Sequence, residues 1–224
     1  MIMYNYFMCG RYGVPVSDFK TFGIKDSLPG FNGTYNATPG LFLPVLLKES
    51  PLRAQLMKWG LIPFWSKEPR VKFSTINARS ETVVTSPAFR EAFKKRRCLV
   101  PCIGFYEWQR HADGTKDPYY IHLKSRPMFA MAGIWDSWKD VEGKELRTFA
   151  IVTTTPNDLM APIHTRMPVI LPKEAEDVWT NASTPIDTLK SLMVPYDTSN
   201  MDAYRISTRV NNPENNDPRI LEKV

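Results

Sequence analysis

Cysteine is scarce in this sequence of 224 residues, and its scarcity excludes several classes of protein. Only three cysteines occur, so the chain has no disulfide framework, and none shows the paired CxxC spacing of a structural zinc site. We interpret Cys98 and Cys102 as small core residues and expect a reducing, cytoplasmic compartment. Histidine is equally rare, and because the three histidines are dispersed, we expect neither a metal site nor a cofactor.

Long hydrophobic runs are absent as well. No stretch of about 18 consecutive apolar residues occurs, which predicts no membrane-spanning helix, and residues 1–7 lack the basic and apolar regions of a signal peptide. Nineteen prolines are scattered from Pro15 to Pro218, and no Gly/Ser-rich or charged run marks a linker. We therefore expect one continuous domain and a monomer.

The charge is weighted towards basic residues. The 29 Lys and Arg residues exceed the 23 Asp and Glu residues and give a formal net charge of +6. A polyanionic partner such as nucleic acid fits this balance, and so does a basic enzyme without such a partner. The cluster KKRR at residues 94–97 ends a predicted helix, where it either stabilises the helix dipole or binds phosphate.

The distribution of apolar residues predicts an α+β fold. Short apolar, β-branched and aromatic runs predict strands at residues 42–47, 54–59, 98–103, 119–123, 128–135 and 148–154. Glycines in HADGTKDP and DVEGKE predict hairpin turns. Helix starts are predicted where a hydroxyl residue precedes proline, at Ser86–Pro87, Thr155–Pro156 and Thr184–Pro185, and acidic residues open another helix at 172–179. Because strands and helices do not alternate regularly, we predict a mostly antiparallel sheet with short helices.

Three motifs carry candidate functional residues, each with an alternative interpretation. In WGLIPFW (59–65) the aromatics suit stacking on unpaired bases, or they are buried core residues. INARSET (76–82) combines an amide, an arginine and a carboxylate, which is typical of a site at a strand end or of a solvated loop. In GFYEW, Glu107 shares a strand face with Phe105, so it is either a general acid with raised proton affinity or the partner of an arginine.

One histidine and one cysteine lie in distinctive surroundings. His164, in PIHTRMP, lies between prolines and two residues before Arg166, where it could transfer protons near an anion. His111 and His122 are interpreted as structural. Cys9 directly follows Met8, and translation from Met8 with removal of that methionine would leave Cys9 at the N-terminus. Its thiol and α-amine together would then capture aldehydes.

Taken in order, the motifs MCGRYG, YNATPG, WGLIPFW, INARSET, RRCLVPCIGFYEW, MAGIW, TTTPNDLMAPIHTRMPVIL and VNNP span residues 8–212. In this order they resemble the SOS-response-associated peptidase (SRAP) family, the abasic-site-processing proteins. The resemblance implies one α+β domain over residues 9–224, with a twisted, barrel-like sheet, short peripheral helices and a basic channel. It also implies a DNA-damage protein that binds single-stranded DNA and attaches covalently to abasic sites.

The resemblance also assigns catalytic residues. Cys9 matches the family cysteine whose amine and thiol close a thiazolidine on the aldehyde of an abasic deoxyribose. Asn77, Glu107 and His164 match the family's other catalytic residues; we expect Asn77 to position the amine or the sugar and the other two to exchange protons. Because residues 1–8 would block the amine of Cys9, they are expected to be a mis-assigned start or an extension that is removed.

DNA-binding residues follow from the same resemblance. The arginines are expected to hold phosphates, and Trp65 is expected to stack on a base. The matching positions are Arg11, Asn36, Trp65, Arg79, Thr153 and Arg166. Two other functions stay open: a thiol-dependent peptidase that cleaves before Cys9, and a single-stranded DNA-binding module without covalent chemistry.

Overall fold

Short strands make up most of the regular structure, as the turn-rich sequence predicts. The computed structural model describes residues 9–16, 19–24, 27–48, 52–69 and 75–224. The strands are Tyr12–Val14 (β1), Thr34–Ala37 (β2), Phe42–Leu47 (β3), Arg53–Trp59 (β4), Asn77–Arg79 (β5), Arg97–Cys102 (β6), Gly104–Arg110 (β7), Lys116–Leu123 (β8), Phe129–Lys139 (β9), Glu145–Thr154 (β10), Met167–Pro168 (β11), Ile170–Leu171 (β12) and Met201–Arg205 (β13). The α-helices are Arg90–Lys95 (α1), Glu176–Thr180 (α2) and Ile186–Ser191 (α3). Short 3-10 helices are Lys20–Phe22 (η1), Lys173–Ala175 (η2), Thr198–Asn200 (η3), Thr208–Asn211 (η4) and Pro218–Leu221 (η5).

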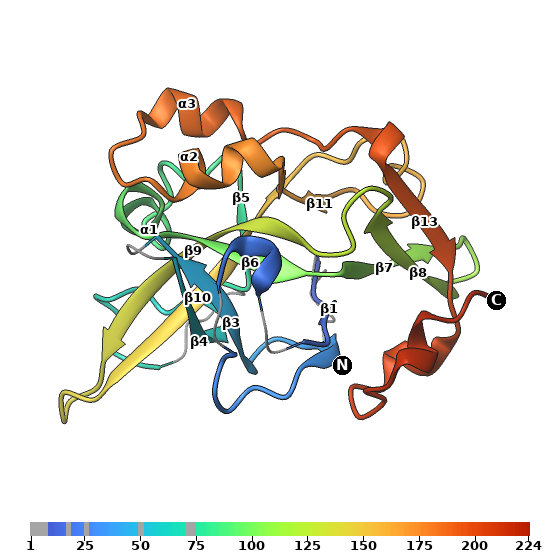
Figure 1. The fold of residues 1–224 in the computed structure, drawn as a ribbon, viewed down its shortest axis with the longest axis horizontal. Coiled ribbons are helices and arrows are strands. Elements are labelled where there is room, and N and C mark those ends of the chain that lie inside the picture. Colours follow the sequence, from blue (N-terminus) through green and yellow to red (C-terminus); the bar gives the residue numbers. More distant parts are fainter. Residues whose placement is uncertain (1–8, 17–18, 25–26, 49–51, 70–74) are drawn as a thin grey trace.

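Strands β3, β4, β6, β9 and β10 close into a barrel (Figure 1). β3 pairs antiparallel with β4 and β6, and β9 pairs antiparallel with β6 and β10. β10 completes the ring by pairing parallel with β4. Closure satisfies the strand edges within the barrel. The predicted α+β fold with a twisted, mostly antiparallel, barrel-like sheet is confirmed, and β10 makes the barrel mixed.

β10 continues beyond the ring and gains two further partners there. On one edge Ile151 and Thr153 pair, in parallel register, with Asn77 and Arg79 of β5. On the other edge Thr153 and Thr154 pair with β11. The end of β10 therefore lies between two segments that carry predicted site residues.

A second, antiparallel sheet lies beside the barrel, with strand order β13-β8-β7-β1-β2 (Figure 1). β1 pairs with β7, so that Tyr12 is opposite Phe105 and Gly13 is opposite Gly104. At Gly104 a Cβ atom would lie 2.5 Å from the ring of Tyr120, so only glycine allows β7 and β8 to approach this closely. This register therefore determines which residue of β7 lies opposite the segment that precedes β1.

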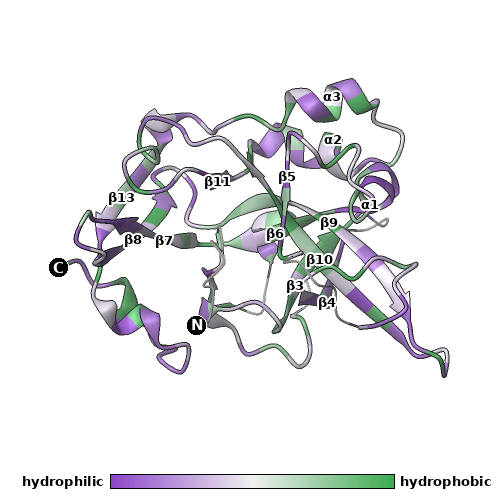
Figure 2. Ribbon diagram, turned by 180° about the vertical axis from the view of Figure 1, so that it is seen from behind, coloured by the Kyte–Doolittle hydropathy of each residue, from purple (hydrophilic) through white to green (hydrophobic). Residues whose placement is uncertain are grey.

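The core lies inside the barrel and between the barrel and its helices. Every residue of β6 is buried, because one face of this strand points into the barrel and the other is covered by α1 and α2. Trp179 of α2 donates from its ring nitrogen to the carbonyls of Cys98 and Gly133, at 3.1 and 3.2 Å. Apolar colouring follows the barrel strands in Figure 2. Cys98 and Cys102 are core residues, as predicted.

The basic cluster at the end of α1 contains a structural arginine. Arg97 is 5% exposed. Its guanidinium donates to the carbonyls of Phe93, Lys94, Trp179 and Asn181. Arg97 thus joins the ends of α1 and α2, a role that neither interpretation of the cluster included.

The helix predicted at residues 172–179 is confirmed, because η2 and α2 together span Lys173–Thr180 with acidic residues in their first turns. The three helix starts predicted from a hydroxyl residue before proline were wrong. α1 begins after Phe89, and α3 has Pro185 rather than Thr184 at its N-cap. The Thr184 hydroxyl donates to the carbonyl of Val178 instead. After Pro156 the chain forms turns rather than a helix, because the Asn157 side chain accepts from the amide of Met160.

Candidate active site

Cys9 lies at the entrance to β1 and against β7. The antiparallel register of β1 and β7 carries Cys9 to Glu107, and the backbone nitrogen of Cys9 lies 2.7 Å from Oε1 of Glu107. The Cys9 thiol also lies near this carboxyl group, which raises the pKa of the thiol. Cys9 has a φ of 42°, in the left-handed region that residues other than glycine seldom adopt. Both nucleophilic atoms of this cysteine therefore face one carboxyl group.

Glu107 is buried, and burial changes its proton affinity. It is 2% exposed, and loss of solvent raises the pKa of Glu107 above its ordinary value. The nearby His164 and the hydrogen bonds from Cys9 oppose this rise in part. Burial and the Glu107 carboxyl group also raise the pKa of the Cys9 thiol, whereas Arg166 lowers it. The sequence-based prediction of a glutamate with raised proton affinity agrees with this environment.

His164 approaches Glu107 from the turns that follow β10. Its Nε2 lies 3.9 Å from Oε2 of Glu107, within ion-pair range but beyond hydrogen-bonding distance. Its Nδ1 lies 3.2 Å from both the amide nitrogen and the carbonyl oxygen of Arg166. The amide can donate to a neutral ring, and the carbonyl can accept from a protonated one. The backbone of Arg166 thus supports the imidazole in both protonation states, as proton transfer requires. Gln109 of β7 donates to the carbonyl of Pro162 and holds the turns against the sheet.

Arg166 and the end of β5 meet across β10. The Arg166 guanidinium binds both carboxylate oxygens of Glu81, and the Nη2–Oε2 distance is 2.9 Å. The same Nη2 donates to the carbonyl of Thr153 at 2.8 Å. Asn77 and Arg79 share the face of β5 opposite the buried Ala78. The structure thus brings Cys9, Glu107, His164, Thr153 and Arg166 together, with Asn77 and Arg79 on the adjacent strand.

Two predicted DNA-binding residues hold another part of the chain. Arg11 donates to the Oδ1 of Asn36 and to the carbonyl of Val210, and its guanidinium lies 5.9 Å from the ring centre of Trp108. Asn36 is 2% exposed, and its amide group donates to carbonyls of the segment 210–215. Both side chains thus fasten the C-terminal segment to β1 and β2.

Trp65 lies apart from these residues, on the loop that follows β4. Its side chain is 52% exposed and that of the adjacent Phe64 is 54% exposed. Trp59, at the start of the same motif, is buried and packs against Tyr12 and Phe149. The core interpretation therefore holds for Trp59, whereas base stacking by the exposed Trp65 stays a prediction.

A sequence model described as SOS response associated peptidase (SRAP) matches residues 8–213. The chain belongs to this family. The abasic site processing protein YoqW of Bacillus subtilis (strain 168) is 42% identical over 223 residues, 96% of this chain and 99% of YoqW. The abasic site processing protein HMCES of Xenopus tropicalis is 31% identical and covers 87% of this chain, which spans 67% of HMCES. A crystal structure of a protein from Bacteroides thetaiotaomicron has a TM-score of 0.85 at 33% identity, and covers 96% of this chain and all 100% of its own.

Sequence reasoning assigned no role to two residues of this SRAP-family chain that support the site. Glu81 stands within the motif INARSET, but its partner Arg166 is 85 positions away, so the motif alone does not identify the pair. Asp136 is 2% exposed, binds Arg96 and accepts from the amide of Phe64, which holds the Trp65 loop. A lone aspartate in a strand of apolar residues is the signal that could have identified it.

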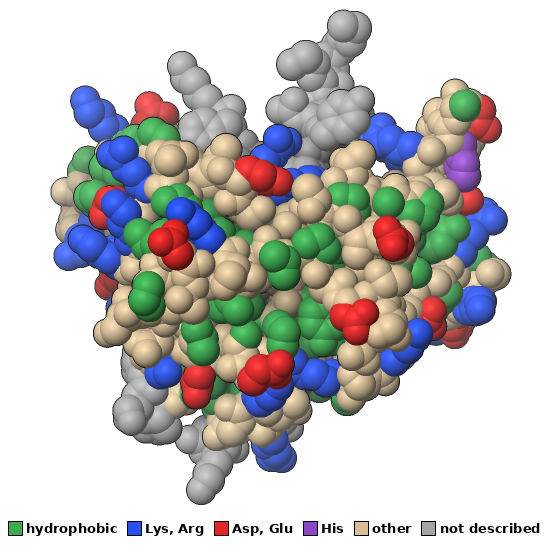
Figure 3. Space-filling view, turned by 90° about the horizontal axis from the view of Figure 1, so that it is seen from above, with side chains coloured by type: hydrophobic (Ala, Val, Ile, Leu, Met, Phe, Trp, Pro, Cys, Tyr) green, Lys and Arg blue, Asp and Glu red, His purple; other side chains and the backbone are tan. Residues whose placement is uncertain are grey.

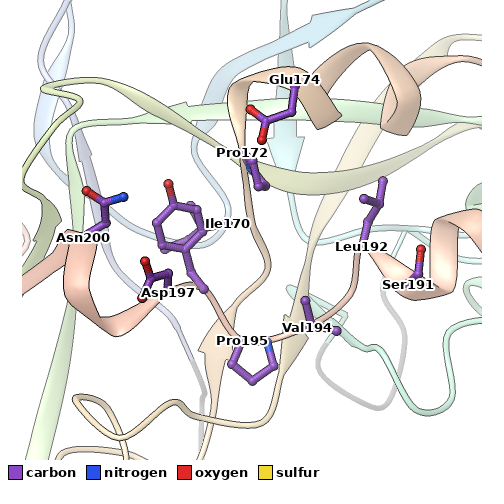
Figure 4. A pocket seen from close by; sticks show the side chains of 10 residues that line it. Ile170, Pro172, Glu174, Ser191, Leu192, Val194, Pro195, Asp197 and Asn200 are labelled. Atoms are coloured by element: carbon purple, nitrogen blue, oxygen red, sulfur yellow. The ribbon is translucent and has the colours of Figure 1, made fainter.

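Other features of the SRAP-family chain lie outside this site. The face seen in Figure 3 mixes Lys and Arg with Asp and Glu side chains. A cavity of about 420 Å³ lies near the end of β12 and the segment after α3, lined by residues such as Ile170, Leu192 and Tyr196 (Figure 4). None of the predicted site residues lines it. Among the described residues no cluster of His, Cys, Asp and Glu could hold a metal ion, and no helix is long and apolar enough to span a membrane.

Proposed function

We propose that this protein captures abasic sites in single-stranded DNA by forming a thiazolidine with an N-terminal Cys9. The observation that carries the proposal is the contact of 2.7 Å between the Cys9 nitrogen and the Glu107 carboxyl group, with Nε2 of His164 3.9 Å from the other carboxylate oxygen. The printed names of YoqW and HMCES, abasic site processing proteins, support the same substrate.

The chemistry has two steps. First, the α-amine of Cys9 attacks the aldehyde carbon of the ring-opened deoxyribose, and the resulting carbinolamine loses water to give an imine. Then the thiol adds across the C=N bond: sulfur bonds to carbon, and the thiol proton passes to nitrogen. Glu107 is suited to deliver the proton that leaves with water, because burial raises its pKa. His164 exchanges protons with Glu107 and assists ring opening of the sugar. Asn77 positions the amine or the sugar.

The same proposal assigns the DNA contacts. Arg79 is exposed and binds a flanking phosphate, and exposed Trp65 stacks on a neighbouring base. Arg166 supplies positive charge beside Cys9, and Thr153 anchors Arg166. Arg11 and Asn36 act indirectly, by holding the segment 210–215 in place at the edge of the site. We propose that the protein acts in the cytoplasm on chromosomal DNA, as a monomer.

The reaction requires a free α-amine on Cys9. Residues 1–8 lie outside the described residues, and the proposal requires their absence from the active form, by initiation at Met8 or by cleavage.

One observation favours autocatalytic cleavage as a second function. The nitrogen that contacts Glu107 is the leaving group of the Met8–Cys9 peptide bond. The thiol could attack the Met8 carbonyl to form a thioester while Glu107 protonates the departing amine, and water would then hydrolyse the thioester.

The test compares protein expressed from Met1 with protein expressed from Met8. Each is incubated with single-stranded DNA that contains one abasic site, and the products are examined on a denaturing gel and by intact mass. We expect a heat-stable adduct whose mass is that of protein plus DNA minus one water, and none with Cys9→Ala. Cys98→Ala is the matched control, because Cys98 is buried in the core.

Each alternative predicts a different result in the same experiment. Loss of residues 1–8 from the Met1 protein, with adduct from both preparations, supports autocatalytic cleavage. Failure of both preparations to form an adduct contradicts the covalent proposal and favours a non-covalent DNA-binding module. An undiminished yield with Cys9→Ala contradicts the assignment of the nucleophile.

A further inference from the structure

Glu81 is the carboxylate of the motif INARSET, and the resemblance assigns it no role. It binds the Arg166 guanidinium through both oxygens, and Arg166 also donates to the carbonyl of Thr153. The Arg166 side chain is 10% exposed and that of Glu81 is 48% exposed. The arginine is thus enclosed, and the glutamate closes it off from solvent.

The position of this ion pair connects two segments of the site. Glu81 follows Asn77 and Arg79 on the chain that leaves β5, and Arg166 follows His164 on the chain that enters β11. β5 and β11 pair with opposite edges of β10, so the ion pair bridges them across Thr153. The amide of Ser80 also donates to the Thr153 carbonyl, at 2.8 Å. Breaking the pair would release the side chain that links the two segments.

The backbone of Arg166 transmits its position to the imidazole. Both its amide and its carbonyl lie 3.2 Å from Nδ1 of His164, whose Nε2 faces Glu107. We propose that Glu81 is a positioning residue: by fixing Arg166 it fixes the orientation of His164 towards Glu107 and Cys9. This inference rests on the proposed cross-linking function.

A competing role for Glu81 would be to occupy Arg166 until a DNA phosphate displaces it. The observations favour positioning, because Arg166 is enclosed and also bound to the Thr153 carbonyl. A phosphate that replaced Glu81 would have to occupy the space of the Glu81 carboxylate itself, which lies just after the end of β5. The two roles predict opposite effects of removing the carboxylate, so one experiment distinguishes them.

The test uses Glu81→Gln and Glu81→Asp in protein that begins at Cys9. Glu91→Gln is the matched control, since Glu91 forms a partly exposed ion pair with Lys95 on α1. At saturating abasic-site DNA, we expect the adduct to form about 10- to 100-fold more slowly with Glu81→Gln, because the proton-transfer geometry is lost. DNA affinity is expected to stay within about twofold of wild type, and Glu81→Asp to restore part of the rate.

A second readout follows the imidazole directly. Long-range ¹H–¹⁵N spectra report the tautomer of each histidine, and we expect the His164 signals, not those of His111 or His122, to change in Glu81→Gln. An unchanged rate with unchanged His164 signals contradicts the positioning role. Tighter DNA binding with faster adduct formation also contradicts it and identifies Glu81 as a competitor of phosphate. If wild-type protein forms no adduct, the proposed function fails, whereas the His164 signals still test the positioning role.

Discussion

Replacing Trp65 with alanine tests the proposed recognition of unpaired bases. The loop that carries Trp65 is held by hydrogen bonds to β9 and β10. The amide of Ile62 donates to the Thr148 hydroxyl at 2.8 Å, and the amide of Phe64 donates to Asp136 at 3.1 Å. The ring nitrogen of Trp138 donates to the carbonyl of Ser66 at 2.7 Å. These contacts are made by other residues, so Trp65→Ala should remove the indole without moving the loop.

The size of the effect follows from the exposure of the ring. Trp65 is 52% exposed, so about half of its surface is available, which is enough for one stacked base. Stacking of one base on an aromatic side chain contributes about 1–3 kcal/mol, which corresponds to a loss of affinity of about 5- to 150-fold. Removal of a half-exposed side chain should change the free energy of unfolding by no more than about 0.5 kcal/mol.

Fluorescence anisotropy with labelled single-stranded DNA measures the affinity, and urea unfolding measures the stability. Phe42→Ala is the control, because Phe42 is exposed to a similar extent, 53%, at the start of β3. Single-stranded DNA should lose affinity for Trp65→Ala and keep it for Phe42→Ala, while duplex DNA should respond little to either. A change of less than about twofold for Trp65→Ala on single strands would refute the stacking role.

Three further substitutions test other parts of the structure. Glu107→Gln should raise the melting temperature at about pH 7 and leave it unchanged near pH 4. The reason is that folding raises the pKa of this carboxyl group, which therefore destabilises the native state only as the pH rises through its unfolded and folded pKa values. Thermal unfolding at both pH values checks this, and equal shifts in the melting temperature would contradict it. Arg79→Ala should weaken DNA binding on all sequences and reduce the slope of log K against log salt by about one, as a salt titration would measure. Arg97→Ala should cost about 3 kcal/mol or more of stability in urea unfolding, because four carbonyls lose their donor; a cost below about 1 kcal/mol would contradict that account.

The longer strands could be predicted because their signal is local. The apolar run at residues 42–47 predicted β3 with its correct bounds. Five of its six residues are buried, and this burial is what the run of apolar residues in the sequence reflects. β11 and β12 span two residues each and left no such pattern. The failed helix after Pro156 shows how a nearby side chain, here Asn157, competes with the backbone for an amide.

The site was partly predictable for a different reason. Glu107 could be identified because a carboxylate among apolar residues of one strand is conspicuous in the sequence alone. The partners of Glu81 and Asn36 could not, because Arg166 and the segment 210–215 are distant in sequence, and only the folded chain brings them close. The sequence identifies chemical groups, whereas the distances between them are properties of the closed barrel.

The parallel pairing of β10 with β4 has a consequence for the time at which the chemistry becomes possible. These strands lie far apart in the sequence, and pairing between distant segments is slow because a long loop must close first. His164 and Arg166 lie on the segment between β10 and β11, so the groups that the proposed function assigns to proton transfer approach Cys9 once β10 is in place. Under the proposed function, a nascent or unfolded chain has the cysteine but not the neighbouring groups that would transfer protons for it. Under that function, completion of folding is the step that activates the cysteine.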